Sequence, residues 1–127
     1  MADLGDVRQA LATALAGTGY RVHLYPPPVV IPPAVVIVPG EPYLTIETIG
    51  RPSQGIIAQV QFEINIAVAH LDTQGALEQL EAVLIDVLTA LPSGTSLDRV
   101  GRPTVETVGP SDLLTCRIDV AQRAALT

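Results

Sequence analysis

Several residue types that carry specialised chemistry are scarce or missing in this chain of 127 residues. It has no tryptophan and no lysine, and its only aromatic residues are Tyr20, Tyr25, Tyr43 and Phe62. Without lysine there is no phosphate-binding P-loop lysine, no Schiff-base amine and no serine–lysine pair. So few aromatic side chains also exclude a platform on which nucleic-acid bases stack. The core must therefore consist of valine, isoleucine, leucine and alanine.

Positive charge is also sparse. The formal net charge is −6, and the seven basic residues are all arginines, scattered along the chain. Because no cluster of cations is visible, little is available to neutralise phosphates. We expect weak sequence-independent affinity for DNA.

Cysteine and long apolar runs are equally limited. Cys116 is the single cysteine, which excludes an internal disulfide. It alternates with Leu114 and Ile118, so we expect it to be a small buried hydrophobic residue. The most apolar run, Val29 to Val38, contains two prolines and is shorter than the roughly 20 residues that span a bilayer. Acidic residues near the N-terminus do not fit a signal peptide. No membrane contact or export by that route is expected.

The clearest pattern is the alternation over Gln59 to Val68, with apolar residues on one face and polar residues on the other. It predicts a half-buried β-strand. A long helix over Thr73 to Leu91 is predicted next, with Asp72 as its cap and Pro92 at its end. One stripe of this helix is apolar and should pack on the sheet: Leu77, Leu80, Leu84, Val87, Leu88 and Leu91.

Two further apolar residues of this helix, Val83 and Ile85, fall outside the stripe on opposite flanks. They widen the apolar surface beyond what one sheet needs. Either loops of the same chain cover them or another subunit does.

The rest of the chain supplies a second helix and further strands. Asp3 is a plausible N-cap for a helix over Leu4 to Leu15. The segment 26–42 holds seven prolines and should be stiff and extended. The expected strands are Arg21–Tyr25, Val35–Val38, Tyr43–Ile49, Thr104–Val108 and Leu113–Ala121, with turns at Pro39–Pro42 and Gly109–Asp112. The sequence therefore predicts one α+β domain over 1–127, a two-layer fold with a mostly antiparallel sheet of five to six strands covered by two helices.

Candidate catalytic and metal-binding groups do not assemble into a recognisable pattern. His23 and His70 are far apart and lack the spacing of metal ligands. The pair Asp98–Arg99 suggests a surface turn. The four serines lie in turn-like segments without a nucleophile-elbow pattern. We expect no catalytic residue, no cofactor and no metal, and therefore no enzyme.

Two segments together carry a resemblance to a known family. One is the proline-rich stretch Pro32 to Tyr43. The other is Ala76 to Leu80 continued by Val87 to Leu91, after an alternating strand. With the N-terminal helix, they resemble the small tail-terminator, or tail-completion, proteins of long-tailed bacteriophages. The likeness spans most of the chain.

The resemblance implies a virion structural protein that assembles as a hexameric ring on the head-proximal end of the tail tube. Such a ring ends tube growth and provides the face that joins the head. Its partners would be copies of itself, the tail tube protein and the head–tail connector, and DNA would pass through it without specific binding. Acidic residues such as Glu47, Glu63 and Glu106 would then repel DNA in the channel.

Closed rings need two different surfaces on each subunit. The candidate subunit-interface residues are Val83, Ile85, Val35, Tyr43 and Arg51. A head–tail connector or neck protein is an alternative of the same class, because it also forms rings. A small cytosolic ligand-binding domain or enzyme is the alternative from a different class, and a pocket with converging polar groups would favour it.

Overall fold

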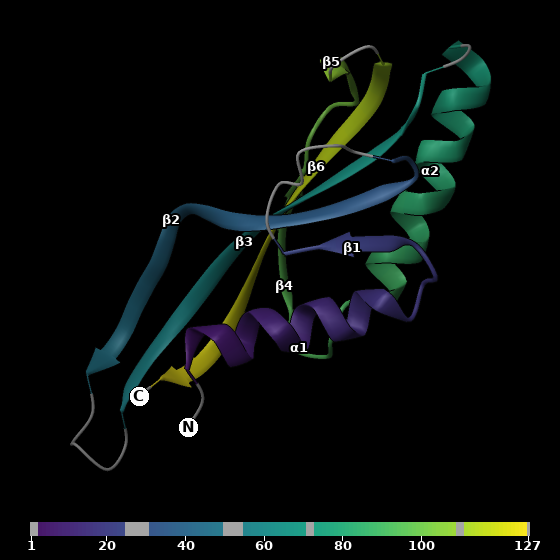
Figure 1. The fold of residues 1–127 in the computed structure, drawn as a ribbon. Helices are drawn as coiled ribbons and strands as arrows, with labels where there is room; N and C mark the ends of the chain where they lie inside the picture. The colour runs from purple at the N-terminus through teal and green to yellow at the C-terminus, as the bar shows by residue number, and fades with distance from the viewer. Residues whose placement is uncertain (1–2, 25–30, 50–54, 71–72, 109–110, 127) are drawn as a thin grey trace.

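The computed structural model describes residues 3–24, 31–49, 55–70, 73–108 and 111–126. Within these ranges the chain forms two helices and six strands (Figure 1). In chain order they are α1 (Leu4–Ala16), β1 (Arg21–His23), β2 (Ala34–Ile49), β3 (Ile56–Ala69), α2 (Thr73–Ala90), β4 (Ser96–Val100), β5 (Thr104–Val108) and β6 (Ser111–Leu126).

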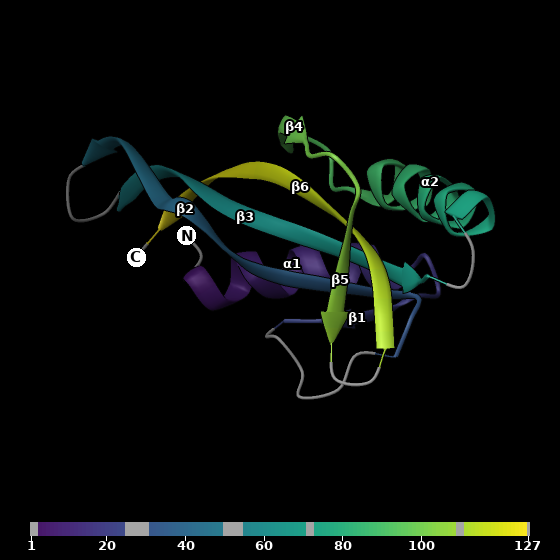
Figure 2. The same ribbon diagram turned by 90° about the horizontal axis from the view of Figure 1, so that it is seen from above.

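All described strands belong to one sheet with the order β1-β2-β3-β6-β4, and β5 also pairs with β6. Every pairing is antiparallel except that of the short β1 with β2. The long strands carry the sheet, and Figure 2 shows β6 curving along its length. The predicted two-layer α+β fold with a mostly antiparallel sheet is confirmed. The strands predicted on either side of Gly109–Asp112 pair antiparallel as β5 and β6, and residues 109–110 of that predicted turn lie outside the described ranges.

The predicted turn at Pro39–Pro42 is wrong, because β2 continues through it as a single strand. Pro39 pairs with Phe62 and the next paired residue is Leu44, opposite Val60, so four residues of β2 face Gln61 alone. This is a bulge. The prolines are tolerated because β2 here has a strand on one side only, so their missing N–H groups break no second ladder.

Gly40 permits the close approach at the bulge. A Cβ atom at this position would lie 3.0 Å from the backbone of Gln61. The proline-rich segment 26–42 is therefore not a free arm from Ala34 onward, since that part belongs to the sheet; residues 25–30 lie outside the described ranges.

Strand β4 was not predicted. The sequence suggested a surface turn at Asp98–Arg99, but both residues lie on β4, which pairs with β6. All five β4 residues are exposed. A strand that buries neither face need not show the alternation of apolar and polar residues from which a strand is predicted.

Both helices pack on the same face of the sheet, and we call this the helix face. The predicted N-cap of α1 is confirmed: Asp3 accepts a hydrogen bond from the Asp6 backbone N–H at 2.7 Å, and Asp6 reciprocates. The core joins alternate residues of the central strands to both helices. Its members include Val7, Leu11 and Leu15 of α1, Val60, Phe62, Ile64, Ile66 and Val68 of β3, and Leu114, Cys116, Ile118 and Val120 of β6.

Helix α2 is rotated relative to the predicted stripe. Its most buried residues are Ala76, Leu80, Val83 and Val87, each about one helical turn from the next. Val83 is thus a core residue, whereas Leu77, expected in the stripe, is exposed. The apolar surface of α2 is wider than its contact with the sheet, so periodicity alone did not fix which side faces inward.

Candidate functional site

The face of the sheet opposite the helices is polar, and we call it the polar face. It carries the alternate residues of β3 that the sequence placed outside the core, including Gln59, Gln61, Glu63 and Asn65, which lie opposite Arg123, Ala121, Asp119 and Arg117 of β6. Two hollows lie on it. One of about 260 Å³ is lined by Gly40, Glu41, Gln61, Phe62, Asp98, Arg99, Arg117 and Asp119. One of about 320 Å³ is lined by Thr45, Gln59, Gln61, Ser96, Leu97, Asp98 and Ala121. Because both hollows take residues from β2 and β4 across the central strands, the polar face is concave.

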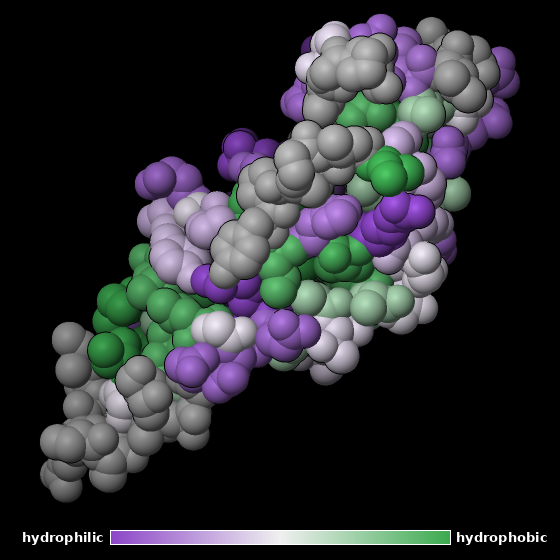
Figure 3. Space-filling model, viewed as in Figure 1, coloured by the Kyte–Doolittle hydropathy of each residue, from purple (hydrophilic) through white to green (hydrophobic). Residues whose placement is uncertain are grey.

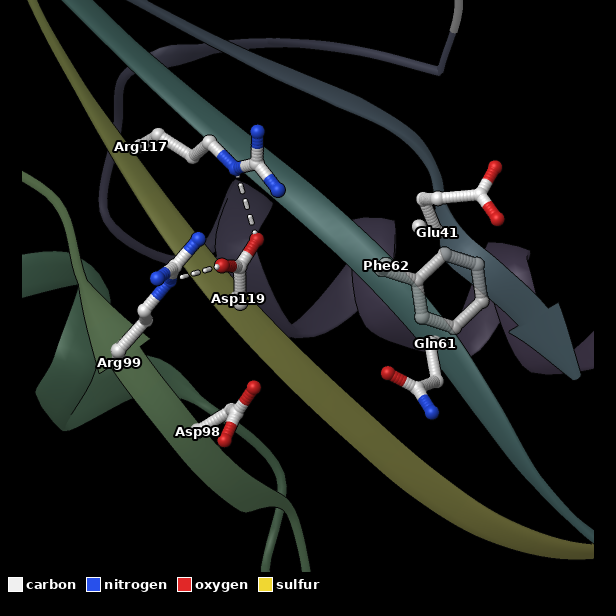
Figure 4. Close-up of a pocket in the computed structure, with 8 residues that line it drawn as sticks. Glu41, Gln61, Phe62, Asp98, Arg99, Arg117 and Asp119 are labelled. Atoms are coloured by element: carbon white, nitrogen blue, oxygen red, sulfur yellow. Dashed lines mark hydrogen bonds and ion pairs between the residues drawn. The ribbon is translucent and has the colours of Figure 1, made fainter. Parts of the chain in front are cut away.

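Asp119 is the centre of a charged network in the first hollow. Its carboxylate accepts hydrogen bonds from Arg99 Nε at 3.0 Å and from Arg117 Nε at 2.9 Å (Figure 4). Arg117 also forms an ion pair with Glu63 at 2.9 Å, and Asn65 donates to the other Glu63 oxygen. Partial burial acts to raise the pKa of Asp119, but the two arginines outweigh it and hold that pKa below its usual range.

A second ion pair joins β6 to β2 across β3 on this face. Arg123 Nε donates to Glu47 at 2.7 Å, and this hydrogen bond lowers the pKa of Glu47. Gln61 donates to Thr45 Oγ1 at 2.9 Å beside it. The three arginines of the polar face, Arg99, Arg117 and Arg123, are therefore each held by a carboxylate of the same chain.

Histidine, cysteine and carboxylate side chains are the groups of this chain that could hold a metal or react as nucleophiles. No group of three or more His, Cys, Asp or Glu side chains that could hold a metal occurs among the described residues. His23 and His70 come from separate segments, and the His70 backbone N–H donates to the Asp112 carbonyl at 3.2 Å. Cys116 is buried as predicted, and burial raises the pKa of its thiol, which keeps it in the unreactive neutral form.

The five predicted interface residues differ in how exposed they are in the structure. Val35 and Val83 are buried in the core, so their side chains are not free to contact another subunit, which corrects the expectation for both. Tyr43 is half-buried, and its hydroxyl accepts a hydrogen bond from Arg8 of α1 at 3.1 Å. Arg51 lies outside the described residues. Ile85 is 60% exposed on the outer side of α2.

Other exposed apolar residues lie at the two margins of the sheet. At the end of β2 and β3, Ile46 pairs with Ala58 and Ile56 pairs with Leu126, both buried partners, so these isoleucines lie on the helix face beyond the helices. With the half-buried Leu44 they form what we call the tip surface. Figure 3 shows hydrophobic residues gathered at this end of the molecule.

At the opposite margin, the apolar residues of β4 and β5 have buried partners on β6. Leu97 pairs with Val120, Val100 with Ile118 and Val105 with Leu114. These three exposed residues form what we call the edge surface. The sequence did not indicate this surface. It predicted the strand that carries Val105, but it suggested a turn at Asp98–Arg99, between Leu97 and Val100.

Neither helix of the described ranges is long and apolar enough to cross a membrane. Comparison of the chain with protein-family models gives no match. Comparison with curated proteins gives no match either.

Proposed function

We propose that the chain is a ring-forming structural subunit of a bacteriophage tail, which caps the head-proximal end of the tail tube as a terminator. The observation that carries the proposal is the pair of exposed apolar surfaces on one sheet: the tip surface at the ends of β2 and β3, and the edge surface on β4 and β5. Exposed apolar patches of this kind mark protein contacts. Two unlike surfaces on one subunit are what a closed ring requires. The resemblance described above supplies the biological setting.

In this proposal the concave polar face lines the channel through which DNA passes. Phosphates bind to arginines that are available to them. Here Arg99, Arg117 and Arg123 are already engaged by carboxylates, which supports passage without binding. The same contacts modify the repulsion expected from the sequence: Glu47 and Glu63 are paired with arginines, so they repel DNA less than free carboxylates would.

The test is the mass of the protein in solution by light scattering, over a concentration series, with and without the tail tube protein of the same genome. We expect a species of about six subunits, in isolation or on tube ends. A protein that remains monomeric and ignores the tube contradicts the proposal. Rings that bind the head–tail connector but not the tube would indicate a neck protein.

A further inference from the structure

Two strand edges of this sheet lack a partner within the described residues. Strand β1 pairs only with Ala34–Val36 of β2, so the later half of β2, Tyr43–Ile49, has β3 on one side and no strand on the other. Figure 1 shows this part of β2 at the outside of the sheet. At the other margin, β4 has β6 as its only neighbour in the sheet order. Free edges present unpaired N–H and C=O groups that another strand can bind.

We propose that neighbouring copies in the ring join head to tail by pairing β4 of one copy with the Tyr43–Ile49 half of β2 of the next. This inference rests on the ring proposed above and names its contact. The occupant of each free edge is thus a second copy of this chain.

Strand direction supports the pairing. Because β2, β3, β6 and β4 are successively antiparallel, β2 and β6 run one way and β3 and β4 run the other. A rotation about an axis to which the strands are inclined, as in a β-barrel, keeps each strand antiparallel to its neighbour. The β4 of one copy then meets the β2 of the next in antiparallel orientation, and the alternation continues across the junction.

Both faces also match across the junction. The rotation keeps the helix faces of all copies on one side. Within one copy, Leu97 lies level with Pro39 of β2, through Val120 and Phe62. The inclination of the strands displaces the next copy along the strand direction, so that Leu97 and Val100 come beside Leu44 and Ile46 and are covered there. On the polar face, Arg99 of β4, which pairs with Asp119 in its own copy, comes beside Glu47 of β2, which pairs with Arg123 in its own copy. The two ion pairs then form one network of alternating charge across the junction. The later half of β2 contains no basic residue, and Arg99 is the one cation of β4. The junction therefore joins apolar to apolar and positive to negative.

The first experiment measures assembly of substituted proteins. Leu97→Asp and Ile46→Asp each place a carboxylate in the junction, and we expect each to raise the concentration for half-assembly about tenfold or more. Leu77→Asp is the matched control, because Leu77 is also apolar and exposed but lies on α2, and it is not among the predicted interface residues. Circular dichroism verifies that all three variants are folded. Rings that tolerate Leu97→Asp and Ile46→Asp, or that are lost with Leu77→Asp alone, overturn the edge pairing.

The second experiment tests whether the contact joins unlike surfaces. A protein with Ile46→Cys is mixed with a protein with Leu97→Cys and treated with a short bifunctional maleimide; the native Cys116 is buried. We expect cross-linked dimers in the mixture and at least tenfold fewer in either protein alone. Dimers that form equally well in each protein alone would indicate a symmetric contact and overturn the proposal.

The two proposals fail differently. If wild-type rings form but the cross-link and the Leu97→Asp effect are absent, the ring remains and the edge pairing is wrong. If the wild-type protein stays monomeric with and without the tube, both are wrong.

Discussion

The middle and the margins of the helix face follow the same alternation of apolar and polar residues, but they have different surroundings. In the middle, Phe62 is 1% exposed under the two helices. At the margins, Ile46 is 48% exposed and Leu97 is 49% exposed, although both pair with buried residues on the same face. An alternating pattern therefore shows which side of a strand is apolar, but not what covers that side.

The largest expected effect tests the same contrast on α2. Val83 is 2% exposed and Ile85 is 60% exposed, two positions apart. Val83→Asp would bury an unpaired carboxylate, at a cost of several kcal/mol, so we expect most of the protein to be unfolded at neutral pH. Ile85→Asp should leave the free energy of unfolding within about 0.5 kcal/mol of wild type. Chemical denaturation followed by circular dichroism measures both. A folded, stable Val83→Asp protein would remove Val83 from the core.

The next effect compares the two parts of the helix face directly. Phe62→Ala should lower the free energy of unfolding by about 3–5 kcal/mol, because it leaves a cavity between sheet and helices. Ile46→Ala should cost less than about 1 kcal/mol in the monomer, since half of that side chain is already in water. Urea denaturation at a concentration where only monomer is present gives both values. Similar losses for the two would mean that the tip is covered within a single chain.

A smaller effect concerns the helix that covers the middle. Asp3→Ala removes the reciprocal cap of α1, and we expect a loss of about 1 kcal/mol. Asp3→Ser, which restores a side-chain acceptor, should recover most of it. Thermal unfolding of the three proteins at one pH tests this. Equal stability of Asp3→Ala and wild type would show that the cap contributes nothing measurable and that α1 is stabilised by the packing of residues such as Leu11 and Leu15.

The smallest effect comes from the polar face. Asp119→Asn weakens the contacts to Arg99 and Arg117, which are partly exposed, so the loss at pH 7 should not exceed about 1 kcal/mol. The folded-state pKa of Asp119 is lowered, so its contribution is present above the unfolded pKa of about 4 and disappears as the pH falls through the folded value. The stability difference between wild type and Asp119→Asn should therefore shrink below about pH 4. A stability difference that grows on acidification would mean that the folded-state pKa of Asp119 is raised and not lowered.

Much of the fold was predictable because β3, β6 and α1 have patterns that their surroundings do not override. The alternation over Gln59–Val68 identified the buried face of β3, and Asp3 marked the start of α1. The continuity of β2 was not predictable, because Pro39–Pro42 has the composition of a turn, whereas the pairing of Pro39 and Leu44 with β3 carries the strand across it. The rotation of α2 depends on which of its apolar flanks reaches the sheet.

The candidate site was predictable only as a polar face. The sequence placed Glu63 and Asn65 on the outer side of one strand and Arg117 and Asp119 on the outer side of another. Which of them meet depends on the register of β3 with β6, and that register is set by pairing far apart in sequence. Arg99 joins them through β4, the strand that the sequence did not indicate.

The bulge in β2 also changes the phase of the strand. Before it, odd-numbered residues such as Val35 and Ile37 point to the core; after it, even-numbered residues such as Leu44 and Ile46 take the helix face. Without this change of phase, Leu44 and Ile46 would project into the polar hollow, and Thr45 would lie among the apolar residues. The segment Gly40–Tyr43 thus acts as a frame shift within one strand, and the apolar character of the tip depends on its length.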